Sequence, residues 1–145
     1  METEIAKSNS MNKKQRNQNR MTILVGALIS CFIGFYNTYP LVYSDTGTYI
    51  ASGFTGEVPN DRSLFYGLFM RHISLSTTPW LIILVQSLLV SWLLHMTFGL
   101  FFKETKRNIL FLASLTFVTL TTGFSHNVSM LLPDIFCAIA LLCVR

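Results

Sequence analysis

The chain has 145 residues, of which 51% are hydrophobic and only 12% are charged. This composition is typical of a membrane protein and excludes an ordinary water-soluble domain. We interpret the net charge of +4 as a signal of membrane orientation, because basic residues flank the apolar segments, and not as a signal of nucleic-acid binding.

The N-terminal segment, residues 1–20, is rich in Asn, Gln, Ser and Lys and has no aromatic residue. Because it can bury little apolar surface, we expect a disordered cytoplasmic tail. The apolar run over about residues 21–43 predicts the first span, an uncleaved signal anchor. Lipoprotein processing at Cys31 is the alternative, although the chain stays apolar after it. The basic residues before this span predict a cytoplasmic N-terminus; they are Lys7, Lys13, Lys14, Arg16 and Arg20.

Further apolar runs predict spans over about residues 79–102, 108–124 and 130–145. A second basic cluster between the second and third spans agrees with a cytoplasmic N-terminus; it contains Lys103, Lys106 and Arg107. The last run is barely long enough to cross a bilayer, so we expect truncation at the C-terminus. The sequence therefore predicts an all-α, multi-pass helical bundle of about four spans in the cell membrane.

The predicted outer loop, residues 44–78, contains the amphipathic stretch "NDRSLFYGLFMRHIS" over residues 60–74. We expect it to form an interfacial helix that starts from an Asn or Asp cap. Leu64, Phe65, Leu68, Phe69 and Ile73 would form its apolar side, while Ser63, Gly67 and Arg71 share another face. Arg71 would bind either lipid headgroups or a phosphate group of a ligand.

Ionisable residues outside the basic anchors gather on this outer face. Asp45 follows the first span directly, and Asp134 follows Pro133 at the start of the fourth. Each has a structural interpretation, Asp45 as the cap of a short helix and Asp134 as a first-turn acid. Together, however, the two carboxylates are candidates for sharing a metal ion or dividing base and electrostatic roles.

Three stretches of the sequence resemble those of a known family. They are "YSDTGTYI" after the first predicted span, "DR" at the start of the amphipathic segment and "LLPDIFCAIALL" at the fourth predicted span. Together they resemble the N-terminal region of integral-membrane glycosyltransferases of the C-type fold, over residues 21–145. The resemblance implies that Asp45 is the catalytic carboxylate and that Asp134 contacts metal or substrate. Arg62 and Arg71 would face a lipid-linked phosphate, with Asp61, His72 and His126 as further candidates for substrate binding.

The expected reaction moves a sugar from a polyprenyl-phosphate donor to a hydroxyl on the extracytoplasmic side, within the cell envelope. Asp45 would act as general base, and a divalent metal ion, held by Asp45 and Asp134, is the candidate cofactor. The expected partners are the bilayer and the lipid-linked donor. Alternatives are a non-catalytic membrane subunit or membrane scaffold, and a transporter fragment with an acidic vestibule. Ser87, Ser91 and His95, four residues apart, favour helix packing over function.

Overall fold

The computed structural model describes residues 2–58, 60 and 62–143. These residues form helices and one isolated β-bridge, with no strand among them, which confirms the all-helical class. The helices are α1 (Glu2–Ser30), α2 (Phe32–Tyr36), α3 (Thr46–Thr55), α4 (Leu64–Ser74), α5 (Trp80–Phe101), α6 (Glu104–Thr121), α7 (Phe124–Ser129) and α8 (Asp134–Cys143).

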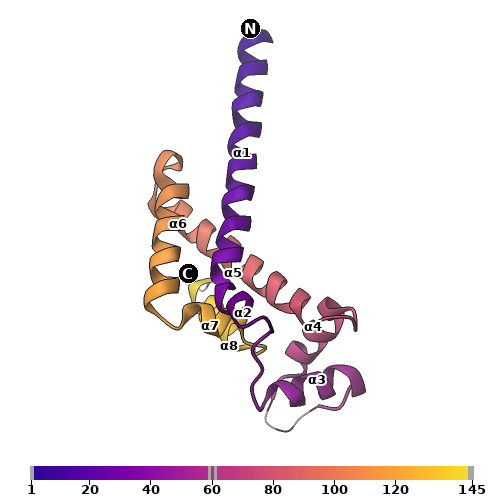
Figure 1. Cartoon of the computed structure of the whole chain (residues 1–145). Helices are drawn as coiled ribbons and strands as arrows, with labels where there is room; N and C mark the ends of the chain where they lie inside the picture. Colours follow the sequence, from indigo (N-terminus) through magenta and orange to yellow (C-terminus); the bar gives the residue numbers. More distant parts are fainter. Residues whose placement is uncertain (1, 59, 61, 144–145) are drawn as a thin grey trace.

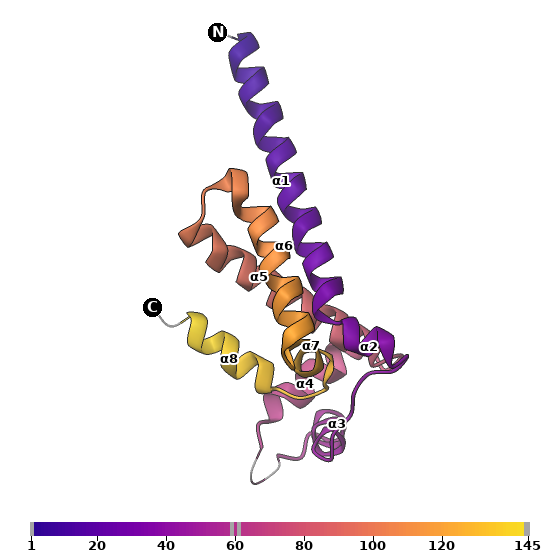
Figure 2. The same ribbon diagram turned by 60° about the vertical axis from the view of Figure 1, so that its left-hand side comes forward.

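Helix α1 is a long rod whose N-terminal half projects beyond the other helices (Figure 1). Its C-terminal half packs against α5 and α6, where Ser91 Oγ donates to the carbonyl oxygen of Ile23 over 2.8 Å. At the opposite end, α3 and α4 pack across one another, and both views place them away from the N-terminus (Figure 2). The α5–α6 turn and the α3–α4 pair therefore lie at opposite ends of the molecule (Figure 2).

Helix α5 agrees closely with the predicted second span, because it begins at Trp80 and ends at Phe101. Of the residues that the structure describes, it is the one helix long and apolar enough to cross a membrane. Its buried positions include Ser87, Ser91 and His95, which confirms the packing role predicted for this stripe. The predicted third span corresponds to α6, which begins four residues earlier than residue 108.

The N-terminal segment differs from its prediction in two ways. Helix α1 already begins at Glu2, where a disordered tail was expected. Lys, Arg and Gln favour helix, and extending an existing helix costs little compared with nucleating one. The helix then ends at Ser30, well before residue 43, because the backbone amides of Ile33 and Gly34 donate to side-chain oxygens of α7 instead. Residues 37–45 continue outside any helix.

The predicted fourth span is also interrupted. After α7, residues 130–132 lie against the segment after α2, where Leu41 N donates to Ser129 O and Leu131 N donates to Leu41 O, over 3.2 and 2.9 Å. Pro133 disfavours helix at the residue before it, so α8 begins only at Asp134. At 1.5 Å per residue α8 is about 15 Å long, half of a hydrocarbon core of about 30 Å.

Helix α4 exists where the amphipathic stretch predicted it, but its start and its packing face differ. Ser63 provides the cap, with its Oγ accepting from Phe65 N over 3.2 Å, so the predicted Asn or Asp cap is wrong. Phe65 is 83% exposed, whereas Tyr66, Gly67 and Met70 are buried. The buried side is the one that carries Gly67, because a glycine allows the backbone of α3 to approach closely.

The largest apolar core lies at the α3–α4 end of the molecule. It joins α3 and α4 to the beginning of α5 and to residues 131–132. Its buried members are Cys31, Tyr49, Tyr66, Met70, Ile82, Ile83, Leu131 and Leu132. The region that contains Asp45 is therefore held by packing and not left as a free loop.

Candidate functional site

Asp45 lies immediately before α3, and its side chain pairs with Arg62. Arg62 Nη1 is 2.5 Å from Asp45 Oδ2, and Ser44 Oγ donates to Asp45 Oδ1 over 3.1 Å. The Asp45 side chain makes no capping hydrogen bond to α3. The helix predicted after Asp45 is present, but the interpretation of Asp45 as its side-chain cap is wrong.

The electrostatics of Asp45 follow from this pairing. The hydrogen bond from Arg62 lowers the pKa of Asp45 below its ordinary value, with Ser44 contributing in the same direction and desolvation opposing. The carboxylate is therefore ionised at neutral pH. A carboxylate with a lowered pKa is also a weaker base, so Asp45 is restrained as long as Arg62 holds it.

Two aromatic residues, Tyr49 and Tyr66, pack between the ion pair and the protein interior. The Arg62 guanidinium carbon lies 6.0 Å from the centre of the Tyr49 ring. Tyr49 in turn meets Tyr66 edge to face, with ring centres 5.2 Å apart. The Tyr66 hydroxyl donates to Gln86 Oε1 over 3.2 Å, inside the protein. The surface pair is thus connected through α3 and α4 to α5.

Asp134 is exposed in the first turn of α8, and the segment before it is tied to the first residue of α3, next to Asp45. Thr46 Oγ1 donates to the carbonyl oxygen of Leu131 over 3.1 Å. Burial, with added contributions from Tyr49 and from the charge of Asp134, raises the pKa of Tyr66. Asp134 therefore acts electrostatically on the same cluster that supports Arg62.

Gln86 on α5 links Tyr66 to the segment that precedes Asp134. Its Nε2 donates to the carbonyl oxygens of Val128 and Met130 over 3.2 and 3.3 Å. Its Oε1 accepts from Tyr66. One buried amide therefore connects α4, α5 and the segment between α7 and α8. The sequence interpretation missed Tyr49, Tyr66 and Gln86, although a glutamine within the apolar run of α5 was a usable signal.

The remaining predicted site residues are not gathered around Asp45. Arg71 Nη1 donates to Gly53 O over 3.3 Å, and its guanidinium lies 5.9 Å from the centre of the Phe54 ring. His72 Nδ1 lies 2.7 Å from the carbonyl oxygen of Leu68 in its own helix. His126 is exposed on α7. Asp61 lies outside the described residues, so its predicted role stays a prediction.

The face of α4 that was predicted to bind a phosphate contacts α3 in part. Gly67 packs against α3, and Arg71 bonds to the α3 backbone. Two of the three residues of that face therefore make contacts within the protein. Arg62 is the predicted cation that the structure places beside Asp45.

The metal prediction finds little support in the arrangement. Within residues 2–58, 60 and 62–143, no group of three or more His, Cys, Asp or Glu side chains is placed to hold a metal ion. Asp45 is already paired with a guanidinium. Because the positive charge of Arg62 offsets the negative charge of Asp45, the site offers a metal ion little net negative charge, and we derive no step through one.

A small apolar cavity of about 280 Å³ lies between α3, α4 and the start of α5. Phe54, Met70 and Leu131 are among its lining residues, and hydroxyl-bearing residues 76–78 border it. Leu131 links the cavity to the site, because its carbonyl oxygen accepts the Thr46 hydroxyl beside Asp45. A much larger groove lies at the other end of the molecule, between α1 and α6.

Comparisons with family models, with curated proteins and with solved structures gave no match for this chain. The site is therefore interpreted from its own geometry and from the sequence motifs.

Proposed function

We propose that the chain is part of a multi-pass membrane glycosyltransferase that takes a sugar from a polyprenyl-phosphate donor on the extracytoplasmic face. The observation that supports this most directly is the Asp45–Arg62 ion pair at the end of the first apolar segment. A carboxylate and a guanidinium side by side supply a base for an acceptor hydroxyl and a ligand for a departing phosphate.

The position of the basic clusters supports the membrane part of the proposal. Lys13 and Lys14 on α1 line the same groove as Asn108 on α6, beside the second basic cluster. The Asp45–Arg62 pair belongs to the opposite end, with α3 and α4. In the proposed arrangement α1, α5, α6 and α8 contribute to a bundle of about four spans with a cytoplasmic N-terminus.

The chemistry that we propose begins with the donor phosphate competing for Arg62. Guanidinium groups bind phosphate oxygens through paired hydrogen bonds. When Arg62 binds the phosphate, its hydrogen bond to Asp45 is lost. The main cause of the low pKa of Asp45 is then removed, and Asp45 becomes a better base. Asp45 then takes the acceptor hydroxyl proton as the new oxygen–carbon bond forms. The bond from the anomeric carbon to the phosphate breaks, and its electron pair leaves with the phosphate that Arg62 holds.

The apolar cavity is consistent with a lipid-linked substrate. It is lined by side chains such as Ile50, Met70 and Ile82, and it adjoins the segment that carries Leu131. Apolar walls of this kind suit a hydrocarbon chain rather than a sugar. The lipid part of the donor would lie there, while its headgroup reaches Arg62.

The test replaces Asp45 by Asn in the protein expressed from its full reading frame, with membranes assayed for sugar transfer from polyprenyl-phosphate donors. Loss of a general base is expected to lower turnover by about 10²–10⁴-fold. Glu57→Gln is the matched control, because Glu57 is an exposed acid in the same outer region. Normal transfer by the Asp45→Asn protein would refute the assignment.

A non-catalytic membrane subunit is the second candidate. The observation that favours it is the hydrogen bond from Arg71 Nη1 to Gly53 O, which gives Arg71 a structural role between α4 and α3. In that case Asp45→Asn and Glu57→Gln would both leave transfer by the host membranes unchanged. Co-purification of partner subunits would then be the informative measurement.

A further inference from the structure

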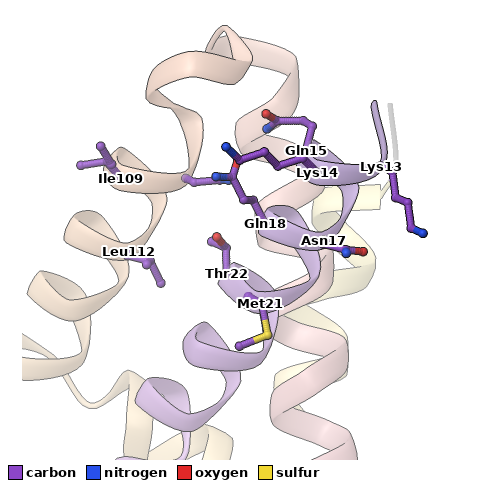
Figure 3. A pocket seen from close by; sticks show the side chains of 10 residues that line it. Lys13, Lys14, Gln15, Asn17, Gln18, Met21, Thr22, Ile109 and Leu112 are labelled. Atoms are coloured by element: carbon purple, nitrogen blue, oxygen red, sulfur yellow. The ribbon is translucent and has the colours of Figure 1, made fainter. Parts of the chain in front are cut away.

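A groove of about 1070 Å³ lies between α1 and α6, at the end of the molecule opposite Asp45. Lys13 and Lys14 lie at its N-terminal end, and Met21 with Ile109 and Leu112 line it further along (Figure 3). Lys14 extends towards α6 in this view, whereas Lys13 extends to the other side of α1 (Figure 3). The groove thus changes from cationic to apolar along its length.

The apolar wall is open to the surroundings. Met21 is 61% exposed and Ile109 is 73% exposed. Met21 follows Lys14 by seven positions along the helix, an axial distance of about 10 Å. This is comparable to the depth from the headgroup region to the upper acyl chains of a bilayer leaflet. Neither water nor a soluble ligand satisfies such a surface over its whole length, whereas an amphipathic lipid does.

Hydrogen bonds fix α6 against α1 and α5 beside the groove. Asn108 Nδ2 on α6 donates to Asn19 Oδ1 on α1 over 3.1 Å, and Gln15 Nε2 donates to the same oxygen over 3.2 Å. Asn108 Oδ1 lies 2.8 Å from Nε2 of buried His95 on α5. Because a carbonyl oxygen only accepts, His95 Nε2 carries the proton in this pair. The two walls are therefore fixed relative to each other before any ligand binds.

We propose that this groove binds one anionic phospholipid, with its headgroup phosphate at Lys14 and an acyl chain along Met21, Ile109 and Leu112. The charge of Lys14 selects anionic over zwitterionic headgroups. The apolar wall selects a lipid over a soluble phosphate compound. This inference rests on the membrane placement proposed above, but it is independent of Asp45 and of sugar transfer.

The test is a titration of the detergent-solubilised full chain with phosphatidylglycerol or phosphatidylcholine of identical chains, followed by native mass spectrometry. We expect phosphatidylglycerol to bind in a 1:1 complex and more tightly than phosphatidylcholine. A lysine near the headgroup contributes about fivefold, so Lys14→Gln should weaken phosphatidylglycerol binding about fivefold. Lys13→Gln should weaken it less, because the Lys13 side chain extends away from α6 (Figure 3). Leu112→Asn should weaken the binding of both lipids.

Lys106→Gln is the matched control, since Lys106 is exposed at the same end but does not line the groove. Its effect should stay below about twofold, because screened surface charges act weakly at a distance. Equal binding of the two lipids, an unaffected Lys14→Gln variant or displacement of phosphatidylglycerol by inorganic phosphate would each overturn the proposal. A parallel flotation assay with phosphatidylcholine vesicles tests membrane insertion alone. If the chain inserts there yet shows no lipid preference, only the lipid site is refuted; failure to insert refutes both proposals.

Discussion

Gly53 and Gly67 meet where α3 crosses α4, so closely that a β-carbon on Gly53 would overlap the carbonyl group of Gly67. A β-carbon on Gly67 would lie 2.6 Å from the carbonyl oxygen of Tyr49. Glycine contacts of this kind let two helix backbones approach one another. The same crossing brings Arg71 to its hydrogen bond with Gly53 O and places Tyr49 against Tyr66.

Gly53→Ala is therefore expected to destabilise the protein by about 1–3 kcal/mol, the usual cost of overpacking. Gly47→Ala is the matched control in the same helix, because a β-carbon there meets no atom within 4 Å. Alanine at Gly47 should stabilise the helix by about 0.5–1 kcal/mol. Thermal unfolding in detergent, followed by circular dichroism, distinguishes the two. Similar shifts for both variants would contradict the close crossing.

Arg62→Gln is expected to raise the pKa of Asp45 towards its ordinary value of about 3.9. A carboxylate whose pKa is lowered by folding stabilises the folded state above that ordinary value. This stabilisation is lost as the pH falls through the lower, folded-state value. Carbon NMR of the labelled Asp45 carboxylate measures the titration directly. Arg71→Gln should leave the titration curve of Asp45 unchanged. An equal effect of the Arg62 and Arg71 substitutions would argue against a specific Asp45–Arg62 ion pair.

Tyr66→Phe should lower the free energy of unfolding by about 1–3 kcal/mol, because Gln86 Oε1 would lose the hydrogen bond donated by Tyr66 in a buried position. Tyr36→Phe provides the comparison, since Tyr36 is 75% exposed. The free energy of unfolding of the Tyr36→Phe protein should change by less than about 0.5 kcal/mol. Denaturant unfolding of both variants is the measurement, and an unchanged Tyr66→Phe protein would remove Gln86 from the support of the site.

Orientation in the membrane is tested by single cysteines introduced into a protein whose native cysteines are replaced by serine. Cysteine at Thr55 or Asn127 should react with an impermeant thiol reagent in intact cells, and cysteine at Lys103 should not. All three positions are exposed in the structure. Labelling at Lys103 but not at Thr55 would reverse the proposed orientation and place the Asp45 surface in the cytoplasm.

The sequence predicted best what depends on local pattern. The long apolar run of α5 and the amphipathic stretch of α4 both formed helices where expected, because periodicity and composition alone favour them. The end of α1 was not predictable in this way. Its backbone amides after Ser30 are satisfied by Ser125 and Ser129, residues 92 and 95 positions further along the chain.

The candidate site was predictable in part for the same reason. Asp45 and Arg62 were recognised as candidates from their place after a span and in the outer loop, and the structure pairs them. The hydrogen bond of Arg71 to α3 was not predictable, because helical spacing shows which residues share a face but not which other helix they contact. Its predicted role towards a phosphate stays a prediction. Gly53, which binds Arg71, carried no signal of that contact in the sequence.

The bond from Thr46 to Leu131 joins residues 85 positions apart, and this separation has a consequence for biosynthesis. At about 5–20 residues per second, a ribosome needs roughly 4–17 s to extend the chain from one partner to the other. During that interval α3 and α4 can cross each other, but the Leu41 and Thr46 hydrogen bonds have no partner yet. Docking of the α3–α4 pair against residues 129–131 must therefore come late in synthesis. A slow-folding substitution near Leu131 would leave a trapped intermediate with that pair exposed to chaperones and proteases.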